Sequence, residues 1–261
     1  MTQPPRAFLG TRTRARRPLG AVALAVALVI GGPAGAGAAD RSETVALGAA
    51  ASARVEVEMG AGRLRLGAAA GDGAGTPMPA AELLRGEFRF DSDDLAPEIG
   101  YEVEGEVGHL TIGQDDDDGF AWPWEDEASG SDWDLALNPA VPTDLAVTLG
   151  AGEGELAFGG LTLTGLRVAL GAGEATLDFG GEWRQGLDAA VEQGVGELTL
   201  RLPREVGVRV AVDHGLGDLT AEGFTEEGDD VYVNETHGAT AVTLDLTVEQ
   251  GVGDLTLELV D

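Results

Sequence analysis

The sequence feature that most constrains the fold is a short glycine–X–glycine turn that recurs between runs of alternating apolar residues. Its six copies are Gly60-Ala61-Gly62, Gly150-Ala151-Gly152, Gly171-Ala172-Gly173, Gly194-Val195-Gly196, Gly215-Leu216-Gly217 and Gly251-Val252-Gly253. The four copies from Gly152 to Gly217 are 21, 23 and 21 residues apart. A fixed period of this size on strand-type patterning is typical of a stacked solenoid. We therefore expect the chain to wind in coils of about 22 residues.

Each repeat has the pattern of a strand with one buried and one solvated face. The residues two, four and six positions after the second glycine are mostly apolar, as in Leu198, Leu200 and Leu202, and polar residues stand between them. Equivalent strands one period apart pair in parallel only if the chain travels once round, and such crossovers are overwhelmingly right-handed. The sequence thus predicts an all-β fold, a right-handed parallel β-solenoid.

Glycines are predicted at two kinds of corner of each coil. The second glycine of the turn can take a positive φ angle and lets the backbones of successive coils approach closely. Gly159-Gly160 and Gly180-Gly181 would form a second corner. We expect Glu106-Val107-Gly108 to be a degenerate copy of the turn, because it lies about two periods from both Gly62 and Gly152.

The first 39 residues read as an export signal that is removed from the mature chain. They contain five arginines, an apolar stretch of twelve residues at 19–30 and a small-residue exit at 36–39. Cleavage after Ala38 or Ala39 would give an extracytoplasmic protein, periplasmic or secreted. The alternative is an uncleaved membrane anchor, although the stretch is shorter than the roughly 20 residues that a spanning helix needs. Residues 40–261 are predicted to form a single solenoid domain with excursions at 114–132 and 223–240.

The charge of the chain restricts its partners. The chain has 46 acidic residues, 16 arginines and no lysine or cysteine, and five arginines but no acidic residue precede Asp40. The mature chain therefore has a formal charge of −35. Long-range repulsion argues against binding to nucleic acid or to an anionic membrane surface, and the expected partners are cations or basic surfaces. The alternative is that the acidic surface only keeps a β protein soluble and prevents stacking on its own copies.

Three stretches point to a known family: Trp133-Asp134-Leu135-Ala136-Leu137-Asn138-Pro139, then residues 145–152, then Leu156-Ala157-Phe158-Gly159-Gly160-Leu161. This succession resembles the bacterial toast-rack domains and the related LiaF-like C-terminal domains of cell-envelope proteins. The resemblance implies a β-solenoid, an extracytoplasmic setting and, in some relatives, a role in sensing envelope stress. It implies no catalytic residues. The chain differs from the LiaF type in having a signal peptide in place of several membrane spans.

The excursion at 114–132 holds one group of candidate binding residues. Asp115, Asp116, Asp117 and Asp118 form an acidic run that could hold a cation, and a solvated acidic loop is the alternative. Trp122, Trp124 and, just beyond, Trp133 could form a sugar platform or a protein contact, because aromatic rings carry much of the energy at interfaces. The alternative is that these rings cover one end or flank of the solenoid.

A second candidate site follows from the acidic residue that comes directly after many of the turns. If the coils stack about 4.8 Å apart, Glu153, Glu174, Glu197, Asp218 and Asp254 form a ladder of carboxylates. A divalent cation such as Ca²⁺ would relieve their repulsion. The alternative is that these exposed carboxylates simply face water.

No catalytic residues are expected. Without cysteine or lysine, a nucleophile or base would have to be Ser, His, Asp, Glu or Tyr. His109, His214 and His237 show neither zinc-site spacing nor a triad pattern, and the first two are predicted at corners beside a glycine. Paired carboxylates are abundant, so a polysaccharide-cleaving site is the alternative.

The sequence therefore predicts an exported, non-enzymatic structural or interaction module of the cell envelope, with a link to the envelope stress response implied by the resemblance alone. Its partner is expected to be a protein or another envelope component. The alternatives are a calcium-dependent adhesin and a glycan-binding or glycan-cleaving β-helix protein. The last strand, residues 255–260, ends the chain without an evident cap, so a free strand there could pair with a partner or a second copy.

Overall fold

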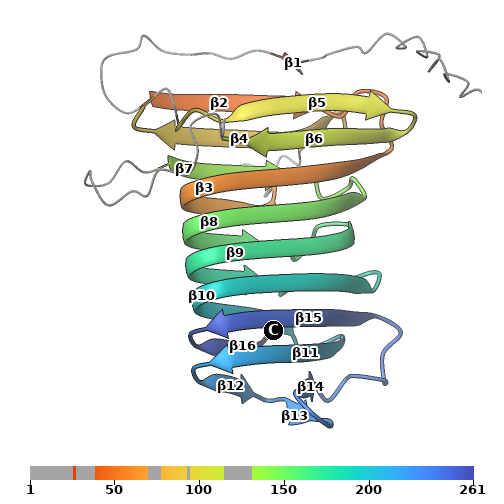
Figure 1. Cartoon of the computed structure of the whole chain (residues 1–261). Coiled ribbons are helices and arrows are strands. Elements are labelled where there is room, and N and C mark those ends of the chain that lie inside the picture. The colour runs from red at the N-terminus through yellow and green to blue at the C-terminus, as the bar shows by residue number, and fades with distance from the viewer. Residues whose placement is uncertain (1–25, 28–38, 70–77, 93–94, 115–130) are drawn as a thin grey trace, which may run out of the picture.

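The computed structural model describes residues 26–27, 39–69, 78–92, 95–114 and 131–261, and this part of the chain contains β-strands and turns but no α-helix. The strands are β1 (Val26–Ala27), β2 (Ala39–Ala46), β3 (Ser52–Ala68), β4 (Glu82–Phe90), β5 (Glu98–Glu104), β6 (Val107–Gly113), β7 (Ser131–Leu137), β8 (Thr143–Ala157), β9 (Leu163–Asp178), β10 (Leu187–Pro203), β11 (Gly207–Leu216), β12 (Leu219–Glu222), β13 (Thr225–Glu226), β14 (Val231–Val233), β15 (Thr243–Val252) and β16 (Leu255–Val260). They stack into one tall sheet that winds around a narrow interior (Figure 1).

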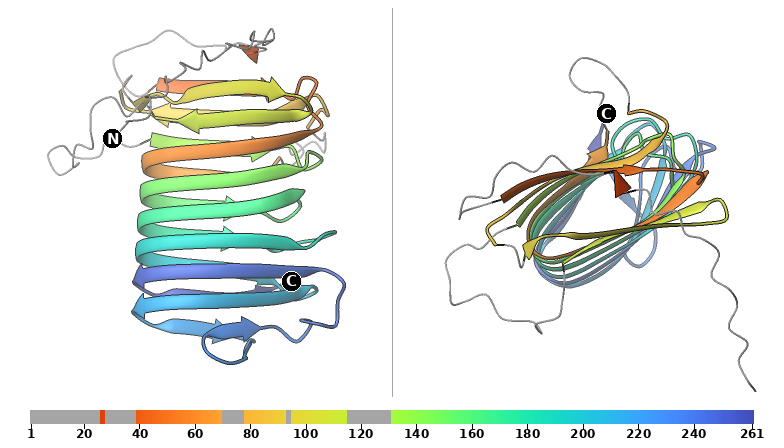
Figure 2. Two further views of the ribbon diagram at one scale, coloured as in Figure 1. Left: turned by 45° about the vertical axis from the view of Figure 1, so that its right-hand side comes forward. Right: turned by 90° about the horizontal axis from the view of Figure 1, so that it is seen from above.

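The middle of the molecule is a right-handed parallel β-solenoid, as predicted. β3, β8, β9 and β10 each run along one face, bend, and return along the opposite face (Figure 1). Neighbouring coils pair in parallel and in register, for example Val57 with Val147 and Val147 with Val168. Seen from above, the coils superimpose as a flattened loop with two broad faces (Figure 2). The repeat of about 22 residues thus corresponds to one turn of the solenoid.

The bends are made by the glycine–X–glycine turns. All six second glycines have positive φ angles, between 128° and 141°. A Cβ atom on Gly152 would lie 1.9 Å from the carbonyl oxygen of Gly62 on the adjacent coil, so no side chain fits there. The second corner is also confirmed: Gly160 and Gly181 have positive φ angles, and a Cβ on Gly159 would lie 1.7 Å from the oxygen of Gly180.

The inward residues of the repeats fill the interior. Rows of Leu and Val run up both faces, and Leu64, Leu177, Leu200 and Leu257 are fully buried. Each such side chain contributes about 1.5–3 kcal/mol through the removal of apolar area from water. The aromatic rings of Phe158 and Phe179 pack against each other just before the second corner, tilted by 48° with centroids 5.0 Å apart. A thin interior of aliphatic rows therefore stabilises the fold.

The coil order differs from the chain order at the C-terminal end. β15 and β16 lie between the β10 coil and the β11–β12 coil, so Val248 pairs with both Val191 and Val212. β16 pairs with β10 on one side and with β12 on the other. The expectation that residues 255–260 form a free strand was therefore wrong, because the chain passes outward to β11 and β12 before it returns to fill the gap.

The N-terminal end shows the same kind of reversal. β6 and β7 form a coil on the far side of β3 from β8, and Gly108 pairs with Ala53, several residues before the corner. Glu106-Val107-Gly108 is therefore not a degenerate copy of the turn. Its distance from Gly62 and Gly152 resembles two periods only because antiparallel strands are inserted between β3 and β8. β2, β4 and β7 pair antiparallel on one face, and β5 pairs antiparallel with β6 on the other (Figure 1).

The two excursions take different places. Within residues 223–240, β13 and β14 pair antiparallel, and β14 adds to the edge of β11. The side chain of Asn234 accepts a hydrogen bond from Val208 N (2.9 Å), which ties this excursion to the last coil. The excursion at 114–132 connects β6 to β7, at the position where other coils have their glycine corner. Residues 115–130 of this excursion lie outside the described residues.

Most of the predicted export signal also lies outside the described residues. Of residues 1–39, Val26–Ala27 and Ala39 are described; Val26–Ala27 pairs antiparallel with β2, and Ala39 is the first residue of β2. No helix with the length and apolar character of a membrane span occurs in the described parts of the chain.

Candidate interaction surface

The carboxylates predicted as a ladder do lie in one row on the outer surface. Glu153 pairs in register with Glu174, and Glu174 with Glu197. Asp254 and Asp218 precede the paired residues Leu255 and Leu219, so they continue the row. Because the last two coils are exchanged, the spatial order ends with Asp254 and then Asp218. We call these five residues the carboxylate row.

The carboxylate row is neutralised at one end only. The guanidinium group of Arg63 on β3 donates hydrogen bonds to Glu153, one of them from Nε at 2.7 Å. This bond raises the pKa of Arg63 above its ordinary value. The other four carboxylates are exposed and form no ion pair with a described residue. Among the described residues there is no group of three or more His, Asp or Glu side chains that could hold a metal ion.

The tryptophan candidates separate into two cases. Trp133 on β7 is buried, with 1% of its surface exposed, and packs edge-on against Phe88 with ring centroids 5.6 Å apart. The expectation that Trp133 contacts a partner was therefore wrong: its position in the strand alternation directs the ring into the core. Trp122, Trp124 and the run from Asp115 to Asp118 lie outside the described residues.

The three histidines lie on separate elements. His214 stands at the corner as predicted, with Nε2 2.9 Å from the carbonyl oxygen of Gly253. His109 lies within β6, paired in register with Arg54, and not at a corner. His237 belongs to the turn after β14, where its amide donates to Asn234 O (3.1 Å). The described structure therefore brings no two histidines together in one site.

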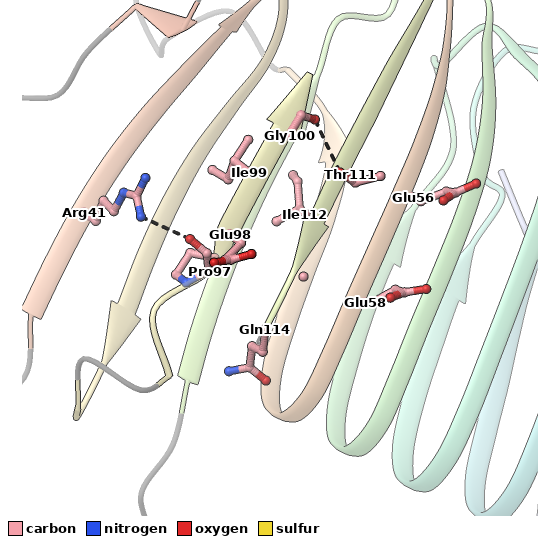
Figure 3. A pocket seen from close by; sticks show the side chains of 11 residues that line it. Arg41, Glu56, Glu58, Pro97, Glu98, Ile99, Gly100, Thr111, Ile112 and Gln114 are labelled. Carbon is pink, nitrogen blue, oxygen red and sulfur yellow. Dashed lines mark hydrogen bonds between the residues drawn. The ribbon is translucent and has the colours of Figure 1, made fainter. Parts of the chain in front are cut away.

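A hollow of about 620 Å³ lies beside β5, β6 and β3 on the outer face of the N-terminal end (Figure 3). Glu56 and Glu58 line one side, and Arg41 lies across from them. Arg41 is already engaged, because its Nη1 donates to Pro97 O (3.1 Å) and its Nε donates to Glu43 Oε1 (2.6 Å).

Gln114, at the end of the same hollow, has a structural role. Its Oε1 accepts from Gly60 N (2.9 Å) and its Nε2 donates to Ser131 Oγ (3.1 Å). These bonds tie the ends of β6 and β7 to the corner of β3. Arg41 and Gln114 thus hold the first strands together, and their polar groups are used within the fold.

A second hollow, of about 650 Å³, runs along the glycine corner across five coils. Its floor is formed by the first glycine of each turn, Gly194, Gly251 and Gly215 among them. It lies along the line where β8, β9 and β10 bend at the left of Figure 1. We call it the corner groove.

One wall of the corner groove is acidic. Glu192 on β10 pairs in register with Glu249 on β15, and Glu249 with Asp213 on β11. All three line the groove, are exposed, and form no ion pair with any residue that the structure describes. Neighbouring coils are about 4.8 Å apart, so three like charges follow one another at that spacing.

Apolar side chains follow the floor of the corner groove directly in the chain, and we call them the apolar border. The middle residues of the last three turns, Val195, Val252 and Leu216, lie side by side in register. Their side chains are 53%, 44% and 71% exposed, and no other large apolar side chain in the described part of the chain is as exposed. On the other coils the same position is alanine, as in Ala151 and Ala172. Large apolar side chains therefore follow the floor glycines over the last three of the five coils only.

The sequence analysis missed this groove, although a signal was present. An acidic residue stands two positions before the first glycine in the last three turns, at Glu192, Asp213 and Glu249, and also in the first turn, at Glu58, but not in the two turns between them. The middle residue of the turn also enlarges in the last three turns from alanine to valine or leucine. Alignment of the turns would have revealed both changes. It would not have shown that Asp213 and Glu249 are neighbours, because β15 lies between β10 and β11 only in the folded structure.

Comparison with known proteins gives a family and a fold. The model of the N-terminal domain of toast_rack (DUF2154) matches residues 35–201. The crystal structure of a "putative cell adhesion protein" from Clostridium sporogenes is 25% identical, with a TM-score of 0.75 over 85% of this chain and 100% of that one. A "putative adhesin" from Bacteroides fragilis is 13% identical, with a TM-score of 0.32 over 84% of this chain and 96% of that one. No curated protein matches the chain in sequence.

Proposed function

This chain belongs to the toast-rack family, and from that premise we propose that it acts as a non-enzymatic, adhesin-like interaction module on the extracytoplasmic side of the cell envelope. The observation that carries the proposal is the likeness to the "putative cell adhesion protein" of Clostridium sporogenes, which extends over the whole of that chain.

The shape of the molecule supports a binding role over a catalytic one. A solenoid offers long outer faces to a partner, and here the two hollows described above lie on the outside of the coils. The interior is filled by apolar side chains such as Leu200 and Val248. Substrates of an enzyme are usually enclosed in a pocket lined by converging polar groups. The open hollows fit contact with an extended partner better.

The start of the described solenoid supports export. β2 begins at Ala39, and cleavage after Ala38 or Ala39 would leave the strand whole from Asp40 onward. Asp40 pairs with Arg89 on β4, both in the ladder and through an ion pair of 3.3 Å. A mature chain that begins there would therefore keep its first strand. The link to an envelope stress response remains a prediction from the family resemblance.

Export can be tested by fusing alkaline phosphatase, which is active only outside the cytoplasm, to the end of the full chain and to residues 40–261. We expect activity from bacteria that make the first fusion and none from those that make the second. Activity from neither fusion would contradict an extracytoplasmic location.

Interaction with the envelope is tested with the purified chain and isolated bacterial envelopes. We expect the protein to sediment with the envelopes in a saturable manner and to leave envelope polysaccharide uncleaved. A protein that stays in the supernatant at all concentrations, or that releases sugar fragments, would overturn the proposed function.

A further inference from the structure

We propose that the corner groove binds an extended segment of a partner protein in which basic and aliphatic residues alternate. This inference rests on the proposed function, because it names the class of partner that the interaction module takes. It is carried by two independent features of the last three coils, an apolar border and an acidic wall.

The apolar border gives the first reason. Val195, Val252 and Leu216 form a continuous exposed row, whereas large apolar residues elsewhere in the described solenoid point inward. Contiguous apolar surface that stays in contact with water marks an interaction site more often than a scattered residue does. The fold does not require bulk at this position, because the corners at Ala151 and Ala172 have the same backbone conformation.

The acidic wall gives the second reason. Arginines neutralise part of the outward surface: Arg201 lies between Asp178 and Glu258, with N–O distances of 3.0 and 2.9 Å. The acidic wall, like most of the carboxylate row, has no such partner among the described residues. Arg209 on β11 pairs with Asp245 at 2.9 Å and so does not reach the acidic wall. The carboxylates of Glu192, Glu249 and Asp213 are therefore left to a partner, and charge complementarity selects a basic one.

The dimensions of the groove select an extended chain. Five coils about 4.8 Å apart span roughly 19 Å, which an extended segment of about six residues covers at about 3.3 Å per residue. Successive side chains of such a segment point in opposite directions. If basic and aliphatic residues alternate, the basic groups reach the carboxylate wall while the aliphatic groups lie on Val195, Val252 and Leu216. The glycine floor leaves room for the backbone of the segment.

The test uses the full chain and a fluorescein-labelled peptide of about eight residues that alternates lysine and valine. Binding is followed by fluorescence anisotropy at moderate ionic strength. Peptides that alternate lysine with serine, and glutamate with valine, serve as comparisons. We expect saturable binding of the lysine–valine peptide, weaker binding of the lysine–serine peptide and no binding of the glutamate–valine peptide.

Matched variants distinguish the groove from the general negative charge. Glu192→Gln with Glu249→Gln should weaken binding of the lysine–valine peptide roughly fivefold. Glu174→Gln with Glu197→Gln, which removes the same charge from the carboxylate row, should change it less than about twofold. Leu216→Ser should weaken the lysine–valine peptide and leave the lysine–serine peptide unchanged. All of these side chains are exposed, so the variants should remain folded.

Three outcomes would overturn the inference: equal losses from the two pairs of glutamine variants, equal binding of the two lysine peptides, and no saturable binding. A fourth outcome would replace the inference: sedimentation shows a dimer, Leu216→Ser dissociates this dimer, and the peptide does not. The groove would then be an interface between copies of the chain. The proposed function fails separately, when the chain does not leave the cytoplasm or does not sediment with envelopes.

Discussion

The backbone of Gly196 packs directly on that of Gly173 in the next coil: a Cβ atom on Gly196 would lie 1.8 Å from the carbonyl oxygen of Gly173. Gly196 also has a φ angle of 136°, which side chains of L residues rarely allow. Two separate restrictions, one conformational and one steric, therefore hold glycine at this corner. The same geometry recurs at the other corners.

Gly196→Ala should destabilise the chain by about 3 kcal/mol or more, because the obstructing atom belongs to the backbone and cannot rotate away. The matched control is Gly228→Ala, where φ is 76° but no atom lies within 4 Å of the added Cβ. That variant should lose only about 1–2 kcal/mol, the cost of the left-handed conformation. Chemical unfolding measures both. Equal losses would show that close packing of the coils contributes nothing.

The repeated coils could be predicted because their information is local. The alternation around Leu198 and Leu200 gives the strand and its buried face, and the glycine pairs give the corners. Each coil contacts only its neighbours, so the period alone orders residues 143–203 correctly. The carboxylate row was predictable for the same reason.

The ends could not be predicted in this way, because pairing there depends on contacts between distant segments. Val248 lies between Val191 and Val212, although it follows both in the chain. The spacing of the turns along the sequence cannot show that β15 inserts between β10 and β11. The burial of Trp133 likewise depends on β4, an antiparallel strand that carries Phe88 and does not belong to the repeat.

Removal of residues 243–261 should unfold more than the deleted strands. β11 joins the solenoid through β15, and β12 joins it through β16. Without them, the apolar row at Val208, Val210 and Val212 faces water or must pair anew with β10. Hydrogen exchange should show loss of protection across residues 207–233 and continued protection across 143–178. Full protection of residues 207–233 would mean that β11 can pair directly with β10.

Neutralising one member of the carboxylate row should stabilise the fold. Glu197 pairs in register with Glu174, and like charges that face each other across strands are destabilising. Glu197→Gln should raise the free energy of unfolding by up to about 0.5 kcal/mol, less so in molar salt. Glu153→Gln is the control, because it removes the partner of Arg63 and should give no gain. Equal gains from the two variants would show that only net charge matters.

The calcium hypothesis is tested by thermal unfolding of the full chain in EDTA, then with calcium or magnesium at millimolar concentration. We expect the two ions to raise the midpoint equally, since the described carboxylates form no group that could enclose an ion. A rise with calcium alone would indicate a specific site. Replacement of the run from Asp115 to Asp118 by asparagine would then show whether the site lies there.

Stability should fall in alkaline solution because of Tyr101. Its hydroxyl group donates to Leu47 O (2.7 Å), and burial raises the pKa of Tyr101 above the usual value of about 10. When folding raises the pKa of a group, the group adds stability at any pH below its pKa in the unfolded chain. This added stability is lost as the pH rises through the pKa of the group in the folded chain. Urea unfolding should therefore show a free energy of unfolding that falls as the pH rises above about 10. Tyr101→Phe should lose about 1 kcal/mol at neutral pH and show a smaller alkaline drop, with the remainder from Tyr232, whose pKa burial also raises. An unchanged drop in Tyr101→Phe would assign the alkaline sensitivity to other groups.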